Sequence, residues 1–251
     1  MTHAVISCLH ANLAALEAVL ADIDQQGIAT ITCLGDLVGY GPQPNEVVNL
    51  VRQRAIPTCQ GCWDEDIIEG LNACDCSYPS QLAERRGHQA HQWTAEQLSE
   101  ENKAFLASLP MSLRRDRLLF VHGSPNSQHE YLLPDMDAFA ALERVQTADA
   151  DTLFCGHTHR PYVRELRDGV IRPLGVLKAM AQPPGEDRRQ PCVDDGAAGA
   201  LHVVGHLADR DGAGGLVVNH IGGVGVAMAR LPHRAGIDDA AHGQGHLPLG
   251  W

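Results

Sequence analysis

The stretch AVISCLHANLAALEAVLADIDQQGIATITCLGD (residues 4–36) holds two short apolar runs, at 4–9 and 29–36, separated by a segment with helical spacing. Asn12 can cap the start of that segment, and Gly27 follows its end. Its apolar residues share one helical stripe: Leu13, Leu16, Val19, Leu20 and Ile23. A strand–helix–strand order of this kind predicts parallel strands that are buried under helices.

The same alternation continues along the chain. A second amphipathic helix is expected over 44–55, with Pro44 in its opening turn, and a third strand over 56–61. Further helices are expected over 78–108, broken at Ser99 and Asn102, and over 136–148, and further strands over 117–123 and 151–157. After residue 162, short strand candidates alternate with loops rich in Gly, Asp and Pro, which predicts a second, more antiparallel sheet.

The chain has 251 residues, of which 44% are hydrophobic, and this is enough to fill a sizeable core. We expect a single domain over 1–251. It would consist of a motif-bearing part (1–165), a divergent second-sheet part (166–233) and a tail without periodic pattern (234–251), which we expect to be poorly ordered.

The formal net charge of −12 argues against a nucleic-acid backbone or an anionic membrane as the main partner. No run of 18 or more apolar residues occurs, so we expect no membrane span. The N-terminal residues MTHAVISCLH lack the charged segment and apolar core of a signal peptide, and we therefore expect a cytoplasmic protein.

Polar residues with metal-binding side chains follow nearly every expected strand. They are Cys8, His10, Asp36, Cys62, His122, His157 and His159. In doubly wound sheets, ligands bind beyond the carboxyl ends of the parallel strands, where these residues would meet. Neighbouring glycines allow the tight loops that would bring the side chains together. The pattern therefore predicts one shared site.

The ordered motifs CLH (8–10), GD (35–36), GCWD (61–64), HG (122–123) and GHTH (156–159) resemble those of the calcineurin-like metallophosphoesterase superfamily. The likeness is greatest to its small bacterial and archaeal phosphodiesterase-like branch, and it covers roughly residues 3–165. It implies a four-layer α/β sandwich, in which two mixed sheets are flanked by helices. It also implies one or two divalent transition metals (Zn, Fe or Mn) at the strand ends.

The resemblance assigns roles residue by residue. His10, Asp36 and His159 match ligands of the first metal; Asp36, His122 and His157 match ligands of the second, with Asp36 bridging. A metal-bound hydroxide would then hydrolyse a phosphomonoester or a phosphodiester. Arg160 and Tyr40 are candidates for substrate binding, and His129 is a further candidate for the pocket lining.

Three positions depart from the family pattern. Cys8 stands where the family has its first Asp ligand, and Cys62 stands where it has an Asn ligand. Trp63 replaces the His that supports the transition state and the leaving group, so no catalytic acid is assigned. Asp64, which orients that His in the family, would have nothing to orient.

Three interpretations of these departures stay open. Cys8 and Cys62 could ligate as thiolates in a softer site that prefers Zn or Fe over Mn. The site could instead be degenerate, in a protein that only binds a metal or a phosphate. The two cysteines could also form a disulfide or a redox-active pair. The first interpretation, with weakened hydrolysis, is the one we favour from the sequence.

The remaining expectations concern the other cysteines and the partners of the protein. Cys59 is expected in the core, because a redox Cys-x-x-Cys motif normally opens a helix, whereas strand alternation would separate Cys59 from Cys62. A structural zinc bound by these two with Cys74 and Cys76 is disfavoured by the one-residue spacing of the second pair. The expected partner is a small phosphorylated substrate, and the sequence is compatible with a homo-oligomer.

Overall fold

The computed structural model describes residues 2–71, 76–160, 162, 164–167, 170–173, 216–221 and 224–230. The expected tail (234–251) and the strand candidate near 200–207 lie outside the described residues. No helix in the described part of the chain is long and apolar enough to cross a bilayer.

The first sheet begins with the predicted strand–helix–strand unit. Strands β1 (Thr2–Ser7) and β2 (Thr30–Cys33) pair in parallel, and helix α1 (Leu13–Gln25) connects them. The Asn12 side chain accepts a hydrogen bond from the backbone N–H of Ala15 and so caps α1, as predicted. The apolar stripe of α1 faces the core, which confirms the parallel, helix-covered sheet.

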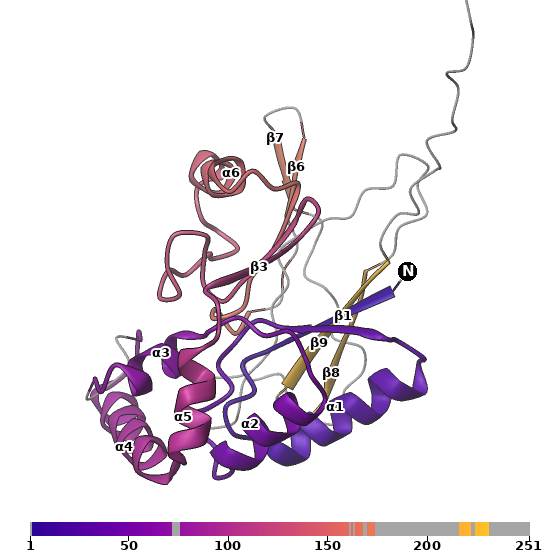
Figure 1. Cartoon of the computed structure of the whole chain (residues 1–251). Helices are drawn as coiled ribbons and strands as arrows, with labels where there is room; N and C mark the ends of the chain where they lie inside the picture. The colour runs from indigo at the N-terminus through magenta and orange to yellow at the C-terminus, as the bar shows by residue number, and fades with distance from the viewer. Residues whose placement is uncertain are drawn as a thin grey trace, which may run out of the picture.

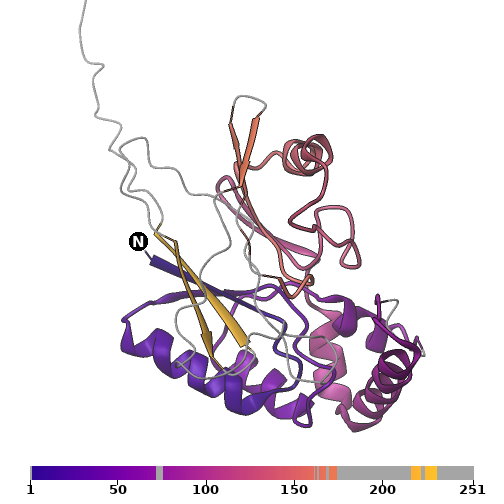
Figure 2. The same ribbon diagram turned by 180° about the vertical axis from the view of Figure 1, so that it is seen from behind.

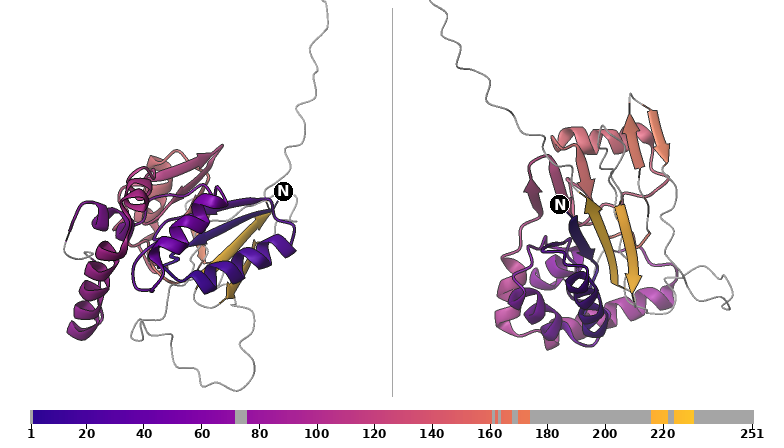
Figure 3. Two further views of the ribbon diagram at one scale, coloured as in Figure 1. Left: turned by 60° about the horizontal axis from the view of Figure 1, so that its bottom comes forward. Right: turned by 90° about the vertical axis from the view of Figure 1, so that its right-hand side faces the viewer.

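Two strands from the end of the chain complete this sheet. Strand β9 (Val224–Arg230) pairs antiparallel with β1, and β8 (Leu216–Ile221) pairs with β9, giving the order β2-β1-β9-β8 (Figure 3). The prediction that these late strands form a separate sheet was therefore wrong. With β2 alone as its neighbour, β1 would have unpaired backbone groups along its other edge, and hydrogen bonds to β9 pair them.

The second sheet has the order β3-β4-β5. Its strands are β3 (Ser112–Arg115), β4 (Leu118–Val121) and β5 (Thr152–Phe154), and helix α6 (Ala138–Thr147) lies between β4 and β5 in the chain. Strands β4 and β5 are parallel, whereas β3, which was not expected from the sequence, is antiparallel to β4. A separate hairpin is formed by β6 (Arg164–Arg167) and β7 (Val170–Pro173).

Four layers result, as Figures 1 and 2 show. Helices α1 and α2 (Pro44–Gln53) cover the outer face of the first sheet, and α6 lies against the second sheet. The contact between the two sheets includes Val5, Leu34 and Cys59 with the stacked rings of Phe120 and Phe154, whose centroids are 4.8 Å apart. The predicted α/β sandwich with two sheets is confirmed.

The connection between the two sheets is helical. Its helices are α3 (Cys62–Ile68), α4 (Gln81–Gln97) and α5 (Glu100–Ala107). Ser99 caps α5, as the predicted break requires, but Asn102 lies inside α5, so no break occurs there. The expected third strand is reduced to one parallel bridge between Cys33 and Thr58.

Helix α3 was not expected from the sequence. It begins at Cys62, immediately after Gly61, and the side chain of Asp64 in its first turn accepts a hydrogen bond from the backbone N–H of Gly61. The expectation that strand alternation continues through Cys62 was therefore wrong. The consequence for the site is that Cys62 lies on a helix, whereas the other candidate ligands follow strands in loops.

Candidate metal centre

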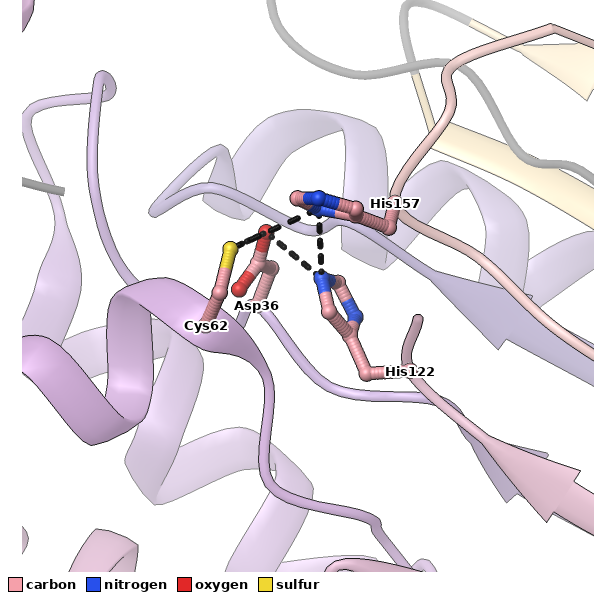
Figure 4. A group of neighbouring side chains, drawn as sticks. All are labelled: Asp36, Cys62, His122 and His157. Atoms are coloured by element: carbon pink, nitrogen blue, oxygen red, sulfur yellow. Dashed lines mark hydrogen bonds and ion pairs between the residues drawn. The ribbon is translucent and has the colours of Figure 1, made fainter. Parts of the chain in front are cut away.

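The seven side chains that follow the strands come together in two groups. The first contains Asp36, Cys62, His122 and His157, all buried (Figure 4). The second contains Cys8, His10 and His159, of which only His159 is half-buried. Within each group, the candidate ligand atoms lie within 4.8 Å of one another.

Asp36 links the two groups through one carboxylate oxygen. Its Oδ2 lies 3.2 Å from Nε2 of His122 and 3.6 Å from Nε2 of His10. Its Oδ1 accepts a hydrogen bond from the backbone N–H of Trp63 at 3.0 Å. The carboxylate is thus anchored on one side and presents Oδ2 to both groups.

The backbone at the site is strained. Five of the seven candidate ligands have a positive φ, between 46° and 65°: Cys8, His10, Asp36, His157 and His159. Such conformations cost on the order of 1–3 kcal/mol each and persist only where the surrounding structure enforces them. Backbone hydrogen bonds from Cys8 to Gly35 and from His10 to Asp36, both 2.9 Å, join the two ligand-bearing loops.

Gly61 makes close packing around Asp36 possible. A Cβ atom added at Gly61 would lie 2.1 Å from the backbone N of Asp36 and 2.2 Å from its Oδ1. No side chain larger than hydrogen fits there without moving the ligand loop, so α3 can approach Asp36 this closely only from a glycine.

The protein fixes the tautomers of two histidines. Nδ1 of His10 lies 3.1 Å from the carbonyl oxygen of Val38, and Nδ1 of His122 lies 2.9 Å from that of Leu34. Because a carbonyl oxygen only accepts, each Nδ1 carries a hydrogen, so each Nε2 faces the site and carries a lone pair when the ring is neutral. Backbone carbonyls commonly orient metal-binding histidines in this way.

These lone pairs face ring nitrogens of two further histidines and one carboxylate oxygen. Nε2 of His10 lies 3.2 Å from Nε2 of His159, and Nε2 of His122 lies 3.3 Å from Nδ1 of His157, with Asp36 Oδ2 beside both pairs. A buried imidazole lone pair that faces an ionised carboxylate oxygen needs a proton or a cation between the two atoms. Imidazole, carboxylate and thiol donors suit Zn, Fe or Mn, so the residues fit the metals that the sequence implied.

The pKa values of the site histidines are shifted in two directions. Burial, reinforced by nearby imidazoles, lowers the pKa of His157 and of His159 to about 3. Burial also opposes charge on His122, but the carboxylate of Asp36 outweighs it and raises the pKa of His122. Burial alone would raise the pKa of Asp36, yet His122 and His10 hold it well below its usual range. One proton is thus shared near Asp36, and a bound cation would displace it.

The two candidate thiol ligands are buried and protonated in the absence of a cation. Sγ of Cys62 lies 3.5 Å from Nδ1 of His157, 3.7 Å from Oδ2 of Asp36 and 4.0 Å from Sγ of Cys76. Sγ of Cys8 lies 3.3 Å from the hydroxyl of Ser7. Burial, with a further contribution from the charge of Asp36, raises the pKa of both thiols. Each would ligate as a thiolate only if a cation replaced its proton.

Cys59 lies in the core, as predicted, although one reason for that prediction was wrong. Cys62 does open a helix, but Sγ of Cys59 donates to the carbonyl oxygen of Phe120 at 3.2 Å, in the layer between the two sheets. Cys62 belongs to a different core cluster, beneath the first sheet. The Cys-x-x-Cys spacing therefore does not mark a redox pair.

Trp63 fills its position with a buried indole. Its ring lies 4.4 Å from the ring of Tyr40, 5.5 Å from that of His91 and 6.1 Å from that of His10, measured between centroids. A Cβ atom at Gly39, whose φ is +96°, would collide with the indole. The indole N–H does not ionise near neutral pH, so this position supplies no general acid or base.

Asp64 does have a role, contrary to expectation. Its Oδ1 accepts from the backbone N–H groups of Leu37 and Val38, and its Oδ2 accepts from that of Gly61. Asp64 therefore ties the loop after Asp36 to the start of α3. An Asp three positions after a helix-starting Gly is a signal that could have been read from the sequence.

The remaining candidates line the surroundings. Tyr40 is half-buried, with its ring 4.9 Å from that of His10, whereas Arg160 is exposed beyond His159. Tyr131, which was not singled out from the sequence, stacks on His157 at 3.9 Å. Its signal was the segment HEYL (129–132), which contains both Tyr131 and His129.

Comparisons with known proteins agree with this geometry. The calcineurin-like phosphoesterase superfamily domain matches residues 1–184. The uncharacterized protein MJ0912 of Methanocaldococcus jannaschii is 38% identical in an alignment of 182 residues that covers 69% of each chain. A crystal structure of a metallophosphoesterase from Sphaerobacter thermophilus is 30% identical, with a TM-score of 0.55 over 93% of this chain and 89% of that one. The hypothetical protein PH1004 from Pyrococcus horikoshii OT3 shares the fold at 21% identity, with a TM-score of 0.54 over 68% and 74% of the two chains.

Proposed function

Because the chain belongs to the calcineurin-like phosphoesterase superfamily and is a metal-dependent phosphoesterase by family, we propose that it hydrolyses a small phosphomonoester or phosphodiester at a dinuclear, cysteine-containing site. The observation that carries this proposal is the convergence of buried acceptor atoms on Asp36 Oδ2 from two histidines held in fixed tautomers. A purely structural core would not gather imidazole nitrogens around one buried carboxylate oxygen on a strained backbone.

Each group of side chains would hold one cation. Asp36, Cys62, His122 and His157 would bind one cation, and Cys8, His10 and His159 would bind the other, with Asp36 contributing to both. Bound cations supply Lewis acidity toward phosphate oxygens and an activated water. Two thiol ligands would shift the preference toward Zn or Fe and away from Mn.

Residues of the chain itself would orient the substrate. Burial raises the pKa of Tyr40, so its hydroxyl stays protonated beside His10 and can donate a hydrogen bond to a phosphate oxygen. Arg160, exposed at the end of the GHTH loop, would meet the negative charge of the substrate. Asp64 would keep the Asp36 loop in place while the substrate binds.

Protonation of the leaving group is the step that this site would catalyse least well. Trp63 cannot protonate it, and a positioned acid typically contributes about 10²–10⁴-fold to a rate. We therefore expect good turnover only for esters whose leaving group needs little protonation. The same observation supports a second candidate function, a protein of this fold that binds a metal or phosphate without hydrolysing it.

Hydrolysis of p-nitrophenyl phosphate and bis-p-nitrophenyl phosphate, with Zn, Fe(II) or Mn added to metal-free protein, tests the proposal. We expect metal-dependent turnover that disappears in Asp36→Asn. Asp24→Asn is the matched control, because it makes the same chemical change at an exposed ion pair with Arg54. Stoichiometric metal binding without turnover on either ester would favour the binding protein, and absence of both would contradict the dinuclear site.

A further inference from the structure

A third group of metal-binding side chains lies outside the site described above. It consists of Glu65 and Asp66 on α3 and His129 in the loop after β4. Nε2 of His129 lies 3.1 Å from Oε2 of Glu65 and 3.5 Å from Oδ1 of Asp66. One oxygen or nitrogen from each residue lies within 4.8 Å of the other two.

Asp66 is the unusual member of this group. It is only 1% exposed, and its carboxylate faces His129 through Oδ1. Its Oδ2 has no hydrogen-bond partner within the described ranges. A buried carboxylate oxygen without a partner is costly, and a cation is one of the few groups that can satisfy both oxygens at once.

The charges around Asp66 also favour a cation. Burial, with the negative charges of Glu65, Asp36 and Glu69, raises the pKa of Asp66 to about 6, although His129 opposes this. No Lys or Arg among the described residues lies within ion-pair distance of Glu65 or Asp66. Among the described residues, the imidazole of His129 is therefore the one basic group within ion-pair distance of these two carboxylates.

We propose that Glu65, Asp66 and His129 form a third divalent-cation site, separate from the two groups around Asp36. Two carboxylates and an imidazole suit Zn or Mn, which bind such ligands at about 2.0–2.2 Å. Ligands at that range from one ion are separated by about 3–4 Å, which is close to the distances to His129. Glu65 and His129 are half-buried, so the cation would keep open positions on its solvent side.

The third site would lie next to the first group. Helix α3 carries Cys62 at its start, with Glu65 and Asp66 three and four residues later. The loop that contains His129 also contains Tyr131, whose ring stacks on His157. A cation held by His129 would therefore fix the loop that packs against a candidate ligand of the dinuclear site.

Counting bound cations tests this inference. Metal-free protein is titrated with Zn²⁺ by calorimetry, and its metal content is measured after dialysis. The double variant Glu65→Gln, His129→Gln is expected to bind one cation fewer per chain than the unmodified protein. Glu69→Gln, at the exposed C-cap of the same helix, is the matched control and should bind as many cations as the unmodified protein. Equal binding by the double variant and the unmodified protein would overturn the proposal.

A second measurement separates this site from the proposed function. Crystals soaked in Zn²⁺ and measured by anomalous diffraction should show a peak between Glu65, Asp66 and His129, and this peak should persist in Asp36→Asn. A filled dinuclear site with no peak at these three residues would overturn the third site alone. A peak at these residues in a protein without phosphoesterase activity would support the third site and contradict the proposed function.

Discussion

The two halves of the proposed dinuclear site differ in how completely the fold builds them. The group of Asp36, Cys62, His122 and His157 is buried throughout and has its own carboxylate. The group of Cys8, His10 and His159 has no carboxylate of its own and depends on Asp36 Oδ2, 3.6 Å from His10. We infer that the first group binds its cation more tightly, because charge and burial both favour it, and that the second fills only when Asp36 is in place.

Asp36→Asn should have the largest effect, since it removes the carboxylate that both groups use. Asn keeps the shape and tolerates the positive φ at this position, so the fold should survive. We expect both cations to be lost and hydrolysis to fall by more than about 100-fold, since loss of even an outer-shell partner of a metal ligand costs about 10–100-fold. Metal content and p-nitrophenyl ester hydrolysis measure this, with Asp24→Asn as the control. Retention of both cations would contradict a shared role for Asp36.

His122→Asn and His159→Asn separate the two halves directly. The His122 variant should lose the tighter cation and about 100-fold in activity, the upper end of the range for disturbed metal sites. The His159 variant should keep the tighter cation and lose only the weaker one. Calorimetric titration with Zn²⁺ distinguishes the two variants. If both variants lose the same cation, the inferred difference between the halves is wrong.

Trp63→His tests whether the missing acid limits the rate. With Cys8→Asp and Cys62→Asn in the same chain, it should raise hydrolysis of esters with poor leaving groups by up to about 100-fold, the low end of the contribution of a positioned acid. The low end is expected because imidazole does not fill the space of the indole beside Tyr40. Trp63→Phe in the same background is the control, since it also removes the indole but adds no acid. Equal rates for His and Phe would place the limitation elsewhere.

Cys8→Ser and Cys62→Ser should each weaken one cation by roughly tenfold, the smaller end of the range for perturbed metal sites. The Cys62 change should weaken binding of the cation beside Asp36 and His122, and the Cys8 change should weaken binding of the cation beside His10 and His159. Competition with a chelator measures both affinities. Unchanged affinity in both variants would assign the two cysteines to packing.

The metal-free protein should be less stable in acid. The pKa of His157 and of His159 is about 3 in the folded chain and near 6.5 in an unfolded one. The unfolded state therefore binds more protons between these values, and stability falls as the pH drops from 6.5 toward 3. We expect a lower urea midpoint at pH 5 than at pH 7.5, and a smaller difference in His157→Gln. If the urea midpoints at pH 5 and pH 7.5 differ by the same amount in the variant and in the unmodified protein, His157 does not cause the loss of stability in acid.

Much of the fold and the site could be predicted because their signals are local. The stripe of α1 and its Asn12 cap lie within one segment, and a polar residue after each strand marks the edge where the strands end. The pairing of β9 with β1 could not be predicted, since the partners are more than 200 residues apart. Helix α3 was missed although Asp64 is a local signal for its start. The bond of Asp64 to Leu37 in the loop after Asp36 could not be predicted, because it joins residues 27 positions apart.

Substitution with cobalt tests the central claim most directly, namely that the cysteines at the strand and helix ends are metal ligands. Metal-free protein is titrated with Co²⁺ while its absorption is recorded. We predict a thiolate-to-cobalt charge-transfer band that weakens in Cys8→Ser and in Cys62→Ser and disappears when both are changed. Binding of Co²⁺ without that band would contradict the account.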